Sequence, residues 1–170
     1  ISNELKIDQS VSHNGVCLTV TAVHDNQHEV TAIAETLEKT NLGNWQPGTR
    51  VNLERCVPLN GRLDGHLVQG HVDGTGRCLW IEDKKGSYEL RFQIDPSFAP
   101  LIIEKGSISL NGISLTIFNV SRDAFTVAII PYTWDHTNIG QLREGDPVNL
   151  EFDLVGKYLQ RRASLSASGS

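Results

Sequence analysis

Several features are scarce in this chain of 170 residues. It contains no run of lysine and arginine and carries a formal net charge of −5, which argues against a groove for the negative backbone of nucleic acid. No apolar stretch approaches the length that crosses a membrane. Only three cysteines occur, and their odd number and wide spacing predict free thiols in a reducing cytosol rather than a disulfide framework. We therefore expect a cytoplasmic globular protein.

Metal ligands are also sparse. His66 and His71 lie close together in the sequence, but a zinc site needs three or four ligands at close spacing. Cys56 and Cys78 do not stand where they would complete such a site. The sequence therefore predicts no metal centre.

The chain repeats itself with a shift of 97 positions. Asn14-Gly15 recurs as Asn111-Gly112, and Val51-Asn52-Leu53-Glu54 recurs as Val148-Asn149-Leu150-Glu151. Other residues kept by the same shift are Thr36 and Thr133, Thr40-Asn41 and Thr137-Asn138, and Gly43 and Gly140. One shift without a gap over more than forty residues indicates two copies of one small domain.

Short alternating segments between turn signals predict β-strands in both copies. The expected strands span residues 16–22, 30–34 and 50–56 in the first copy and 77–82, 88–94, 107–120, 124–130 and 147–152 in the second. Residues 35–41 favour a short helix, and residues 96–100 a turn or short helix. Regularly spaced short strands are typical of small barrels. We predict an all-β fold of two tandem six-stranded Greek-key barrels, followed by a C-terminal helix.

The repeat also sets the expected domain boundaries. These are a first barrel at 1–69, a second barrel at 70–153, a helix at 154–165 that mediates oligomerisation, and a polar tail at 166–170. Leu154, Tyr158 and Leu165 give the helix an apolar stripe, which needs its own barrel or a neighbouring subunit to cover it. Residues 70–97 have no counterpart before Ile1, so we expect the first barrel to lack its first strands. The natural chain is then expected to begin about 30 residues earlier.

Positions whose polar chemistry differs between the copies are candidates for a task that only one copy performs. Cys17 corresponds to Ser114, Cys56 to Asp153, Asp8 to Lys105 and Glu35 to Tyr132. In the second copy these changes put a hydroxyl, a carboxylate and an amine near the ends of neighbouring strands, where they can move protons and hold an oxyanion. The alternative is strand hydrogen bonding by Ser114 and a solvated ion pair between Lys105 and Asp153. Cys17 is either a nucleophile or a small core residue.

Together these segments resemble riboflavin synthase of the alpha-chain type. The segments that carry the resemblance are Asn14 to Val20, Glu35 to Leu37, Thr40 to Gly43, Val51 to Arg55, Gly65 to Asp73, Asn111 to Thr116 and Ile130 to Thr133. The match covers about residues 10–158. It implies a transferase of riboflavin biosynthesis that dismutates two molecules of 6,7-dimethyl-8-ribityllumazine by moving a four-carbon unit, with one substrate in each barrel and no cofactor. It also implies a homotrimer in which unlike barrels of neighbouring subunits face each other, with lumazine synthase as a candidate partner.

The resemblance also implies a set of site residues. Carried over position by position, the catalytic residues are Ser114, Thr116, Asp153, Lys105, Cys17 and His71. The substrate-binding residues are Ser10, Thr19, Glu35, Thr36, Gly65, His66, Ile130, Pro131 and Thr133. Ser114 and Thr116 would bind the ring edge and assist proton transfer, while Asp153 and Lys105 would form a polar wall. Which barrel holds the donor is left open. The competing function is a non-catalytic lumazine or flavin carrier of the antenna-protein kind.

Overall fold

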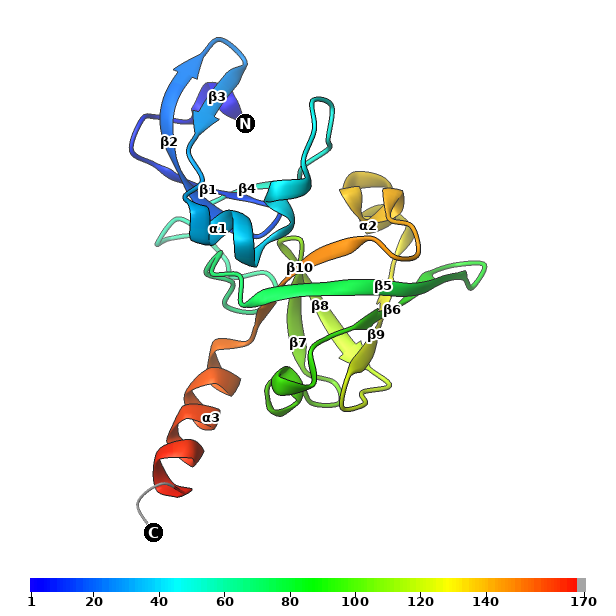
Figure 1. Cartoon of the computed structure of the whole chain (residues 1–170). Coiled ribbons are helices and arrows are strands. Elements are labelled where there is room, and N and C mark those ends of the chain that lie inside the picture. The colour runs from blue at the N-terminus through cyan, green and yellow to red at the C-terminus, as the bar shows by residue number, and fades with distance from the viewer. Residues whose placement is uncertain (168–170) are drawn as a thin grey trace.

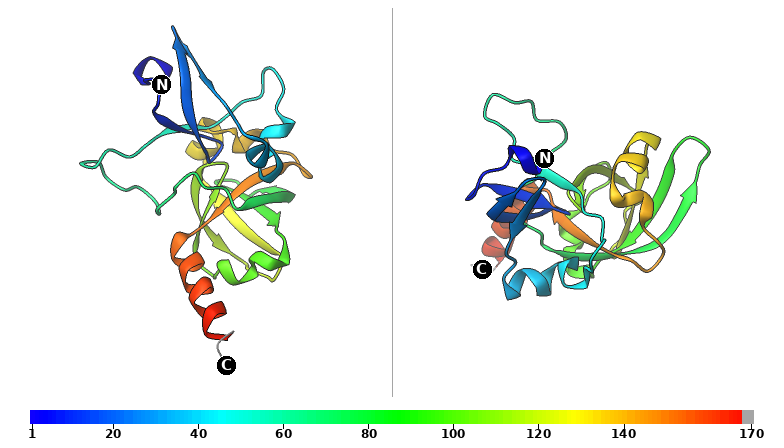
Figure 2. Two further views of the ribbon diagram at one scale, coloured as in Figure 1. Left: turned by 60° about the vertical axis from the view of Figure 1, so that its left-hand side comes forward. Right: turned by 90° about the horizontal axis from the view of Figure 1, so that it is seen from above.

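The second half of the chain is a closed barrel of six antiparallel strands (Figures 1 and 2). The computed structural model describes residues 1–167. The barrel strands are β5 (Gly74–Asp83), β6 (Tyr88–Gln93), β7 (Ser107–Leu110), β8 (Ile113–Phe118), β9 (Ala124–Ile129) and β10 (Pro147–Phe152). Around the barrel they follow the order β10-β5-β6-β9-β8-β7. The prediction of a mostly β fold with a six-stranded barrel is therefore confirmed for this half.

Apolar side chains that alternate along the strands fill the barrel. Leu90 and Phe92 of β6 lie opposite Val127 and Phe125 of β9, and all four are fully buried. The rings of Phe92 and Phe125 lie 5.9 Å apart between centroids. Each such side chain stabilises the fold by about 1.5–3 kcal/mol on burial, so this double row accounts for the close pairing of β6 with β9.

The first half has the same strand arrangement but is not closed. It contains β1 (Ser10–His13), β2 (Val16–His24), β3 (Gln27–Val30) and β4 (Leu53–Arg55), in the sheet order β3-β2-β1-β4. The repeat matches these strands to β7, β8, β9 and β10. The link between β9 and β10 is made by β6 and β5, which have no counterpart within residues 1–69. Within residues 1–167 this sheet is open, so a second closed six-stranded barrel is not observed.

Strand β3 differs in position from the prediction. It covers Gln27–Val30 rather than residues 30–34, and pairs with β2 through a tight turn in which Asp25 has φ +45°. Gln27 and Glu29 are exposed. The predicted position was wrong because an edge strand held by backbone hydrogen bonds needs no apolar side chains. The polar residues of β3 therefore gave no alternating pattern from which to locate it.

Each half also carries one short helix followed by a 3₁₀ turn, as the repeat requires. These elements are α1 (Ala34–Lys39) with η2 (Asn41–Asn44), and α2 (Pro131–His136) with η4 (Asn138–Gln141). Between each pair sits a threonine whose hydroxyl donates one turn back, Thr40 to the Thr36 carbonyl at 2.6 Å and Thr137 to the Thr133 carbonyl at 2.8 Å. These contacts explain why Thr40 and Thr137 recur in the repeat, since Thr36 and Thr133 take part only through their backbone carbonyls.

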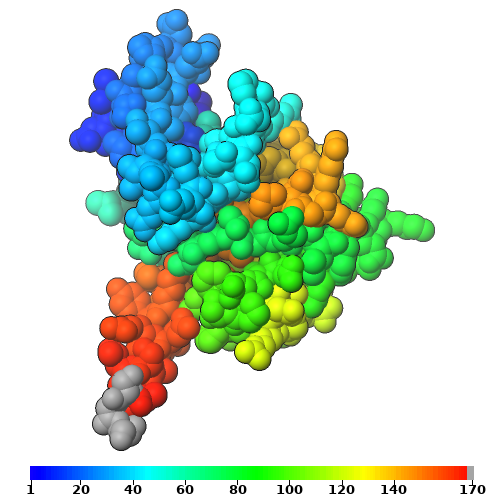
Figure 3. Space-filling view, in the orientation of Figure 1, coloured from blue at the N-terminus to red at the C-terminus, as the bar shows by residue number. Residues whose placement is uncertain are grey.

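Helix α3 (Leu154–Ala167) projects away from the barrel (Figures 1 and 3). Its first turns pack beside η3 (Pro96–Leu101), and a further 3₁₀ turn, η1 (Ser2–Glu4), opens the chain. Val155, Tyr158 and Leu159 are more than half exposed. The helix runs two residues beyond the predicted end, and residues 168–170 of the predicted tail lie outside the described part. Among residues 1–167, no helix has the length and apolar character needed to cross a membrane.

Six asparagines join the two halves. They are Asn14, Asn41 and Asn52 and their repeat equivalents Asn111, Asn138 and Asn149. The amide N–H of Asn41 donates to Oδ1 of Asn149 at 2.7 Å, and that of Asn138 donates to Oδ1 of Asn52 at 2.8 Å. The side-chain NH₂ groups follow the same pattern, because each donates to a backbone carbonyl in the Asn-Gly turn of the other half. Nδ2 of Asn149 donates to the Asn14 carbonyl at 2.9 Å, and Nδ2 of Asn52 donates to the Asn111 carbonyl at 3.0 Å.

Two glycines allow this network to close. Gly15 and Gly112 have φ of +78° and +83°, and they face each other across the joint. A Cβ on Gly112 would lie 2.8 Å from the amide nitrogen of Gly15, and the reverse contact would be 2.7 Å. Glycine is therefore required at both positions for its φ and for its lack of a side chain.

A pair of histidines lies inside the first half. His13 is buried, and its Nδ1–H donates to the Val11 carbonyl, so the Nε2 of the neutral ring accepts from Nε2–H of His28 at 2.8 Å. The hydroxyl of Ser2 donates in turn to Nδ1 of His28 at 3.0 Å. Burial lowers the pKa of His13 below its usual 6.5, the Val11 carbonyl partly offsets this, and a charge on His28 would lower it further.

We predict that Gly112→Ala lowers the free energy of unfolding by about 2–4 kcal/mol, since it adds both backbone strain and a clash. Gly145→Ala is the control for strain alone, because Gly145 has φ +91° but no atom within 4 Å of the place that a Cβ would take; its cost should be about 1–2 kcal/mol. Gly86→Ala, with neither feature, should change stability by less than about 0.5 kcal/mol. Urea unfolding of the three variants measures this, and equal losses at Gly112 and Gly145 would contradict the close contact.

The histidine pair predicts a pH dependence of stability. Because the folded-state pKa of His13 is lowered, the neutral ring stabilises the fold fully above pH 6.5, and that stability is lost as pH falls toward the folded pKa. In His13→Leu, which copies the equivalent Leu110, the decline in unfolding free energy between about pH 7 and pH 5 should be shallower than in the wild type. Chemical unfolding at several pH values tests this; identical slopes would show that His13 does not contribute.

Candidate functional site

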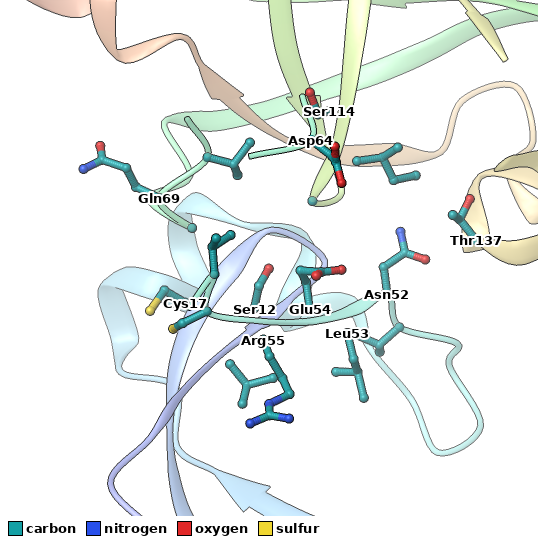
Figure 4. A pocket seen from close by; sticks show the side chains of 18 of the residues that line it. Ser12, Cys17, Asn52, Leu53, Glu54, Arg55, Asp64, Gln69, Ser114 and Thr137 are labelled. Atoms are coloured by element: carbon teal, nitrogen blue, oxygen red, sulfur yellow. The ribbon is translucent and has the colours of Figure 1, made fainter. Parts of the chain in front are cut away.

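A cleft of about 950 Å³ lies between the two halves. Strands β1, β2 and β4 form one wall, and β8, α2 and the loop at residues 63–70 form the other (Figure 4). Five of the site residues expected from the sequence line it, namely Ser10, Cys17, His66, Ser114 and Thr133. The asparagine joint lies at the same interface, so the network that holds the halves together also fixes the width of the cleft.

Ser114 and His66 form the best-defined polar pair in this cleft. The backbone N–H of His66 donates to Ser114 Oγ at 3.2 Å, and His66 Nδ1 lies 2.7 Å from the same oxygen. When the neutral His66 ring carries its proton on Nε2, the Ser114 hydroxyl donates to Nδ1. Nε2 is a buried atom with no hydrogen-bond partner among residues 1–167.

The electrostatics favour a neutral His66 ring. Burial lowers its pKa, and the nearby carboxylates of Asp153 and Glu151 only partly offset this effect. A hydroxyl that takes part in proton transfer needs a group that can accept its proton. A neutral His66 imidazole is such a group for Ser114. Gly65 allows the approach, because its φ is +101° and a Cβ there would lie 2.5 Å from Ser114 Oγ.

Cys17 is the equivalent of Ser114 and meets the other end of the same loop. Its backbone N–H donates to the Gly70 carbonyl at 2.9 Å. Gly70 has φ +80°, and a Cβ on it would lie 2.7 Å from the Cβ of Cys17. The Gly65–His71 segment, hereafter the bridging loop, therefore contacts both equivalent positions.

The other expected residues in the first half lie outside the lining of the cleft. Glu35 is exposed on α1, where the Lys39 ammonium at 2.8 Å lowers its carboxyl pKa. Thr36 lies on the same helix, and Thr19 is exposed on β2. His71 is an exposed residue at the end of the bridging loop.

In the second half the hydroxyl, carboxylate and amine do not line one cavity. Asp153 lies at the start of α3, where its Oδ1 accepts from the Val155 amide at 3.0 Å, and it lines a separate hollow of about 210 Å³ between η3 and α3. Lys105 has φ +64° in a turn, with its Nζ 5.8 Å from the centre of the Phe118 ring. Thr116 is exposed on β8. Ile130 and Pro131 are exposed where α2 begins.

Sequence reasoning missed some residues of this region. The cleft is also lined by Ser12, Asn52, Gln69, Thr137 and Asn138. For three of these the signal was present, because Asn52, Thr137 and Asn138 recur in the repeat, but recurrence does not separate a lining role from a structural one. No cluster of three or more histidine, cysteine or acidic side chains that would hold a metal ion occurs in the described part of the chain.

Comparison with known proteins agrees with this duplicated architecture. The family model described as the lumazine binding domain matches residues 2–56 and 69–153. The chain is 42% identical to the riboflavin synthase of Actinobacillus pleuropneumoniae, over 95% of this chain and 75% of that protein. It is 40% identical to the Bacillus subtilis enzyme with the same coverage. It is 46% identical to that of Mycobacterium tuberculosis, over 89% of this chain and 78% of the relative.

Solved structures share the fold at lower identity. LumP complexed with riboflavin superposes with a TM-score of 0.81 at 24% identity, covering 88% of this chain and 81% of that one. LumP complexed with 6,7-dimethyl-8-(1'-D-ribityl) lumazine gives 0.79 at 21% identity, covering 88% and 80%. With the matches in both halves and identities of 40–46% over most of the sequence, the chain belongs to the riboflavin synthase family.

Proposed function

We propose that this protein is a transferase that makes riboflavin and 5-amino-6-ribitylaminouracil from two molecules of 6,7-dimethyl-8-ribityllumazine. One molecule gives up a four-carbon unit and the other receives it, so atoms balance between two identical substrates and no external oxidant or cofactor is required. The observation that carries the proposal is the pairing of two lumazine-binding repeats whose equivalent residues, Cys17 and Ser114, line one cleft.

The chemistry asks for orientation and charge stabilisation more than for a strong base. The 7-methyl group of the lumazine is acidic because its anion spreads over the ring, so the protein must hold two rings in a reactive geometry and stabilise the charge that develops. We assign proton transfer at the ring edge to Ser114, whose hydroxyl is hydrogen-bonded to a neutral His66. As further residues of the second site we propose Asp153, Lys105 and Thr116, which lie outside the cleft in the single chain. For the first site we propose Ser10, which lines the cleft, and Thr19, Glu35, Thr36 and His71, which lie outside it.

The proposal includes two features of assembly. Both halves follow one Greek-key barrel plan with boundaries at about 1–69 and 70–153, as the shared order of β1 to β4 and β7 to β10 supports. The apolar face of α3, with Val155, Tyr158 and Leu159 exposed, is the contact of a homotrimer. Burial of such a face between subunits removes apolar area that the isolated chain leaves in water.

A lumazine or flavin carrier without turnover is the second candidate, and the likeness in fold to LumP favours it. Identity to LumP stays at 21–24%, whereas identity to riboflavin synthases reaches 40–46%. The second half also keeps a hydroxyl, a carboxylate and an amine at Ser114, Asp153 and Lys105. We therefore place the enzyme first.

Turnover and stoichiometry separate the two candidates. Protein mixed with 6,7-dimethyl-8-ribityllumazine should generate the green fluorescence of riboflavin, and equilibrium dialysis with riboflavin should give two bound ligands per chain. Each repeat then contributes one site. One ligand per chain together with no riboflavin formation would establish the carrier instead.

Substitution at the equivalent positions tests the division of labour between the halves. Ser114→Ala should lower kcat by about 10²–10³, because it removes the hydroxyl from the site of proton transfer. Asp153→Asn should also lower turnover. Cys17→Ser, which makes the first half like the second, should change kcat by much less. Steady-state kinetics measures the rates, and sedimentation checks that assembly is unaltered; wild-type rates in both Ser114→Ala and Asp153→Asn would refute the assignment to the second half.

A further inference from the structure

The bridging loop, residues 65–71, is the one connection that touches both equivalent positions of the cleft within the described chain. At its start, the His66 amide and ring hold Ser114 of the second half. Near its end, the Gly70 carbonyl accepts from the Cys17 amide of the first half. The position of this loop therefore sets how the two equivalent residues lie relative to each other.

A single buried side chain anchors the loop. Glu151 of β10 is only 2% exposed, and its Oε1 accepts from the Gln69 amide at 2.7 Å. Its Oε2 accepts from the amides of Gly70 and His71 at 2.9 and 3.1 Å. Hydrogen bonds to an ionised acceptor are stronger than those between neutral groups. Three of them, on consecutive residues, leave the loop little freedom to shift.

The carboxylate has no lysine or arginine partner within 4.0 Å in residues 1–167. A buried charge needs hydrogen-bond donors or an opposite charge to offset the loss of water. Here the three loop amides are those donors. Glu151 and the bridging loop therefore depend on each other, because the amides offset the burial of the charge and the charge holds the amides in place.

Glu151 has an equivalent in the first half that holds no loop within residues 1–167. The equivalent residue, Glu54 of β4, is exposed, and no hydrogen bond or ion pair of its side chain is found in the described structure. What differs is the loop that Glu151 holds.

We infer that Glu151 is a positioning residue for the four-carbon transfer, acting through the bridging loop rather than by touching substrate. This inference rests on the proposed function. By fixing the amides of Gln69, Gly70 and His71, Glu151 keeps His66 hydrogen-bonded to Ser114 and the Gly70 carbonyl on Cys17. Ser114 and Cys17 are then each held in a constant position within their own sites, and small misplacements of reacting groups cost up to about 10² in rate.

The deciding variant is Glu151→Gln. It keeps the side-chain shape but replaces one acceptor oxygen with an NH₂ group, so that a donor faces backbone donors. We expect hydrogen exchange of the amides of residues 69–71 to accelerate at least about tenfold as the loop opens more often. We expect kcat to fall by about 10–100-fold while KM changes by less than about threefold, because the ring contacts are retained and their alignment is lost.

Two further variants make the test specific. Glu54→Gln removes the equivalent carboxylate, which holds no loop, and should leave hydrogen exchange at residues 69–71 at the wild-type rate. Glu151→Asp keeps both acceptor oxygens on a shorter side chain, and should restore part of the lost kcat and of the exchange protection. If Glu151→Gln does not fold, as thermal unfolding would show, the aspartate variant decides through the same two readouts.

A failure of this inference can be told apart from a failure of the proposed function. Lack of riboflavin formation by the wild type would refute the function, while the exchange measurement would still report on the anchor. Wild-type kcat in folded Glu151→Gln, or unchanged exchange at residues 69–71, would overturn the positioning role. Wild-type values of both in Glu151→Asp, where the glutamine variant is unfolded, would overturn it equally.

Discussion

The joint between the repeats is the constraint on which the rest of the structure depends. Two Asn-Gly turns meet so closely that neither glycine has room for a side chain, and six asparagines exchange hydrogen bonds around them. Net stabilisation by a single buried hydrogen bond is only about 1 kcal/mol, but leaving one of these amides unpaired costs more. The halves therefore cannot slide or separate by small steps, and the cleft beside the joint has a defined width.

Duplication explains which residues were kept and which changed. The residues common to both copies are concentrated at the joint and at the helix turns beside it. Each copy repeats the same internal contacts there, and across the joint the bonds are exchanged between the halves. Among the residues that differ, Cys17 and Ser114 face the cleft, whereas Glu35, Lys105 and Asp153 lie outside it. Symmetry in the scaffold thus coexists with asymmetry in the chemistry, as expected for a protein that brings together two identical molecules and treats them differently.

Much of the fold was predictable from the sequence, because alternation locates half-buried strands and the repeat relates one half to the other. Strand β3 was not, since its polar residues carry no alternation signal. Five expected site residues line the cleft, but the link between His66 and Ser114 was not foreseeable, as it depends on the path of a glycine-containing loop. Glu151 was hidden for another reason. It matches Glu54, and recurrence in both copies does not reveal which backbone amides a carboxylate binds.

The two turns at the joint also have a chemical consequence. Asn-Gly is the dipeptide in which the glycine nitrogen most easily attacks the asparagine side chain, closing a succinimide that opens to aspartate or isoaspartate. In the folded protein the Oδ1 of Asn14 and that of Asn111 are engaged by the amides of Asn52 and Asn149, which restrains the side chain from that reaction. An unfolded chain has no such restraint. A carboxylate formed at either position would then stand among asparagine side chains whose hydrogen bonds require an amide there. Each period in the unfolded state therefore allows covalent damage to accumulate at Asn14 and Asn111.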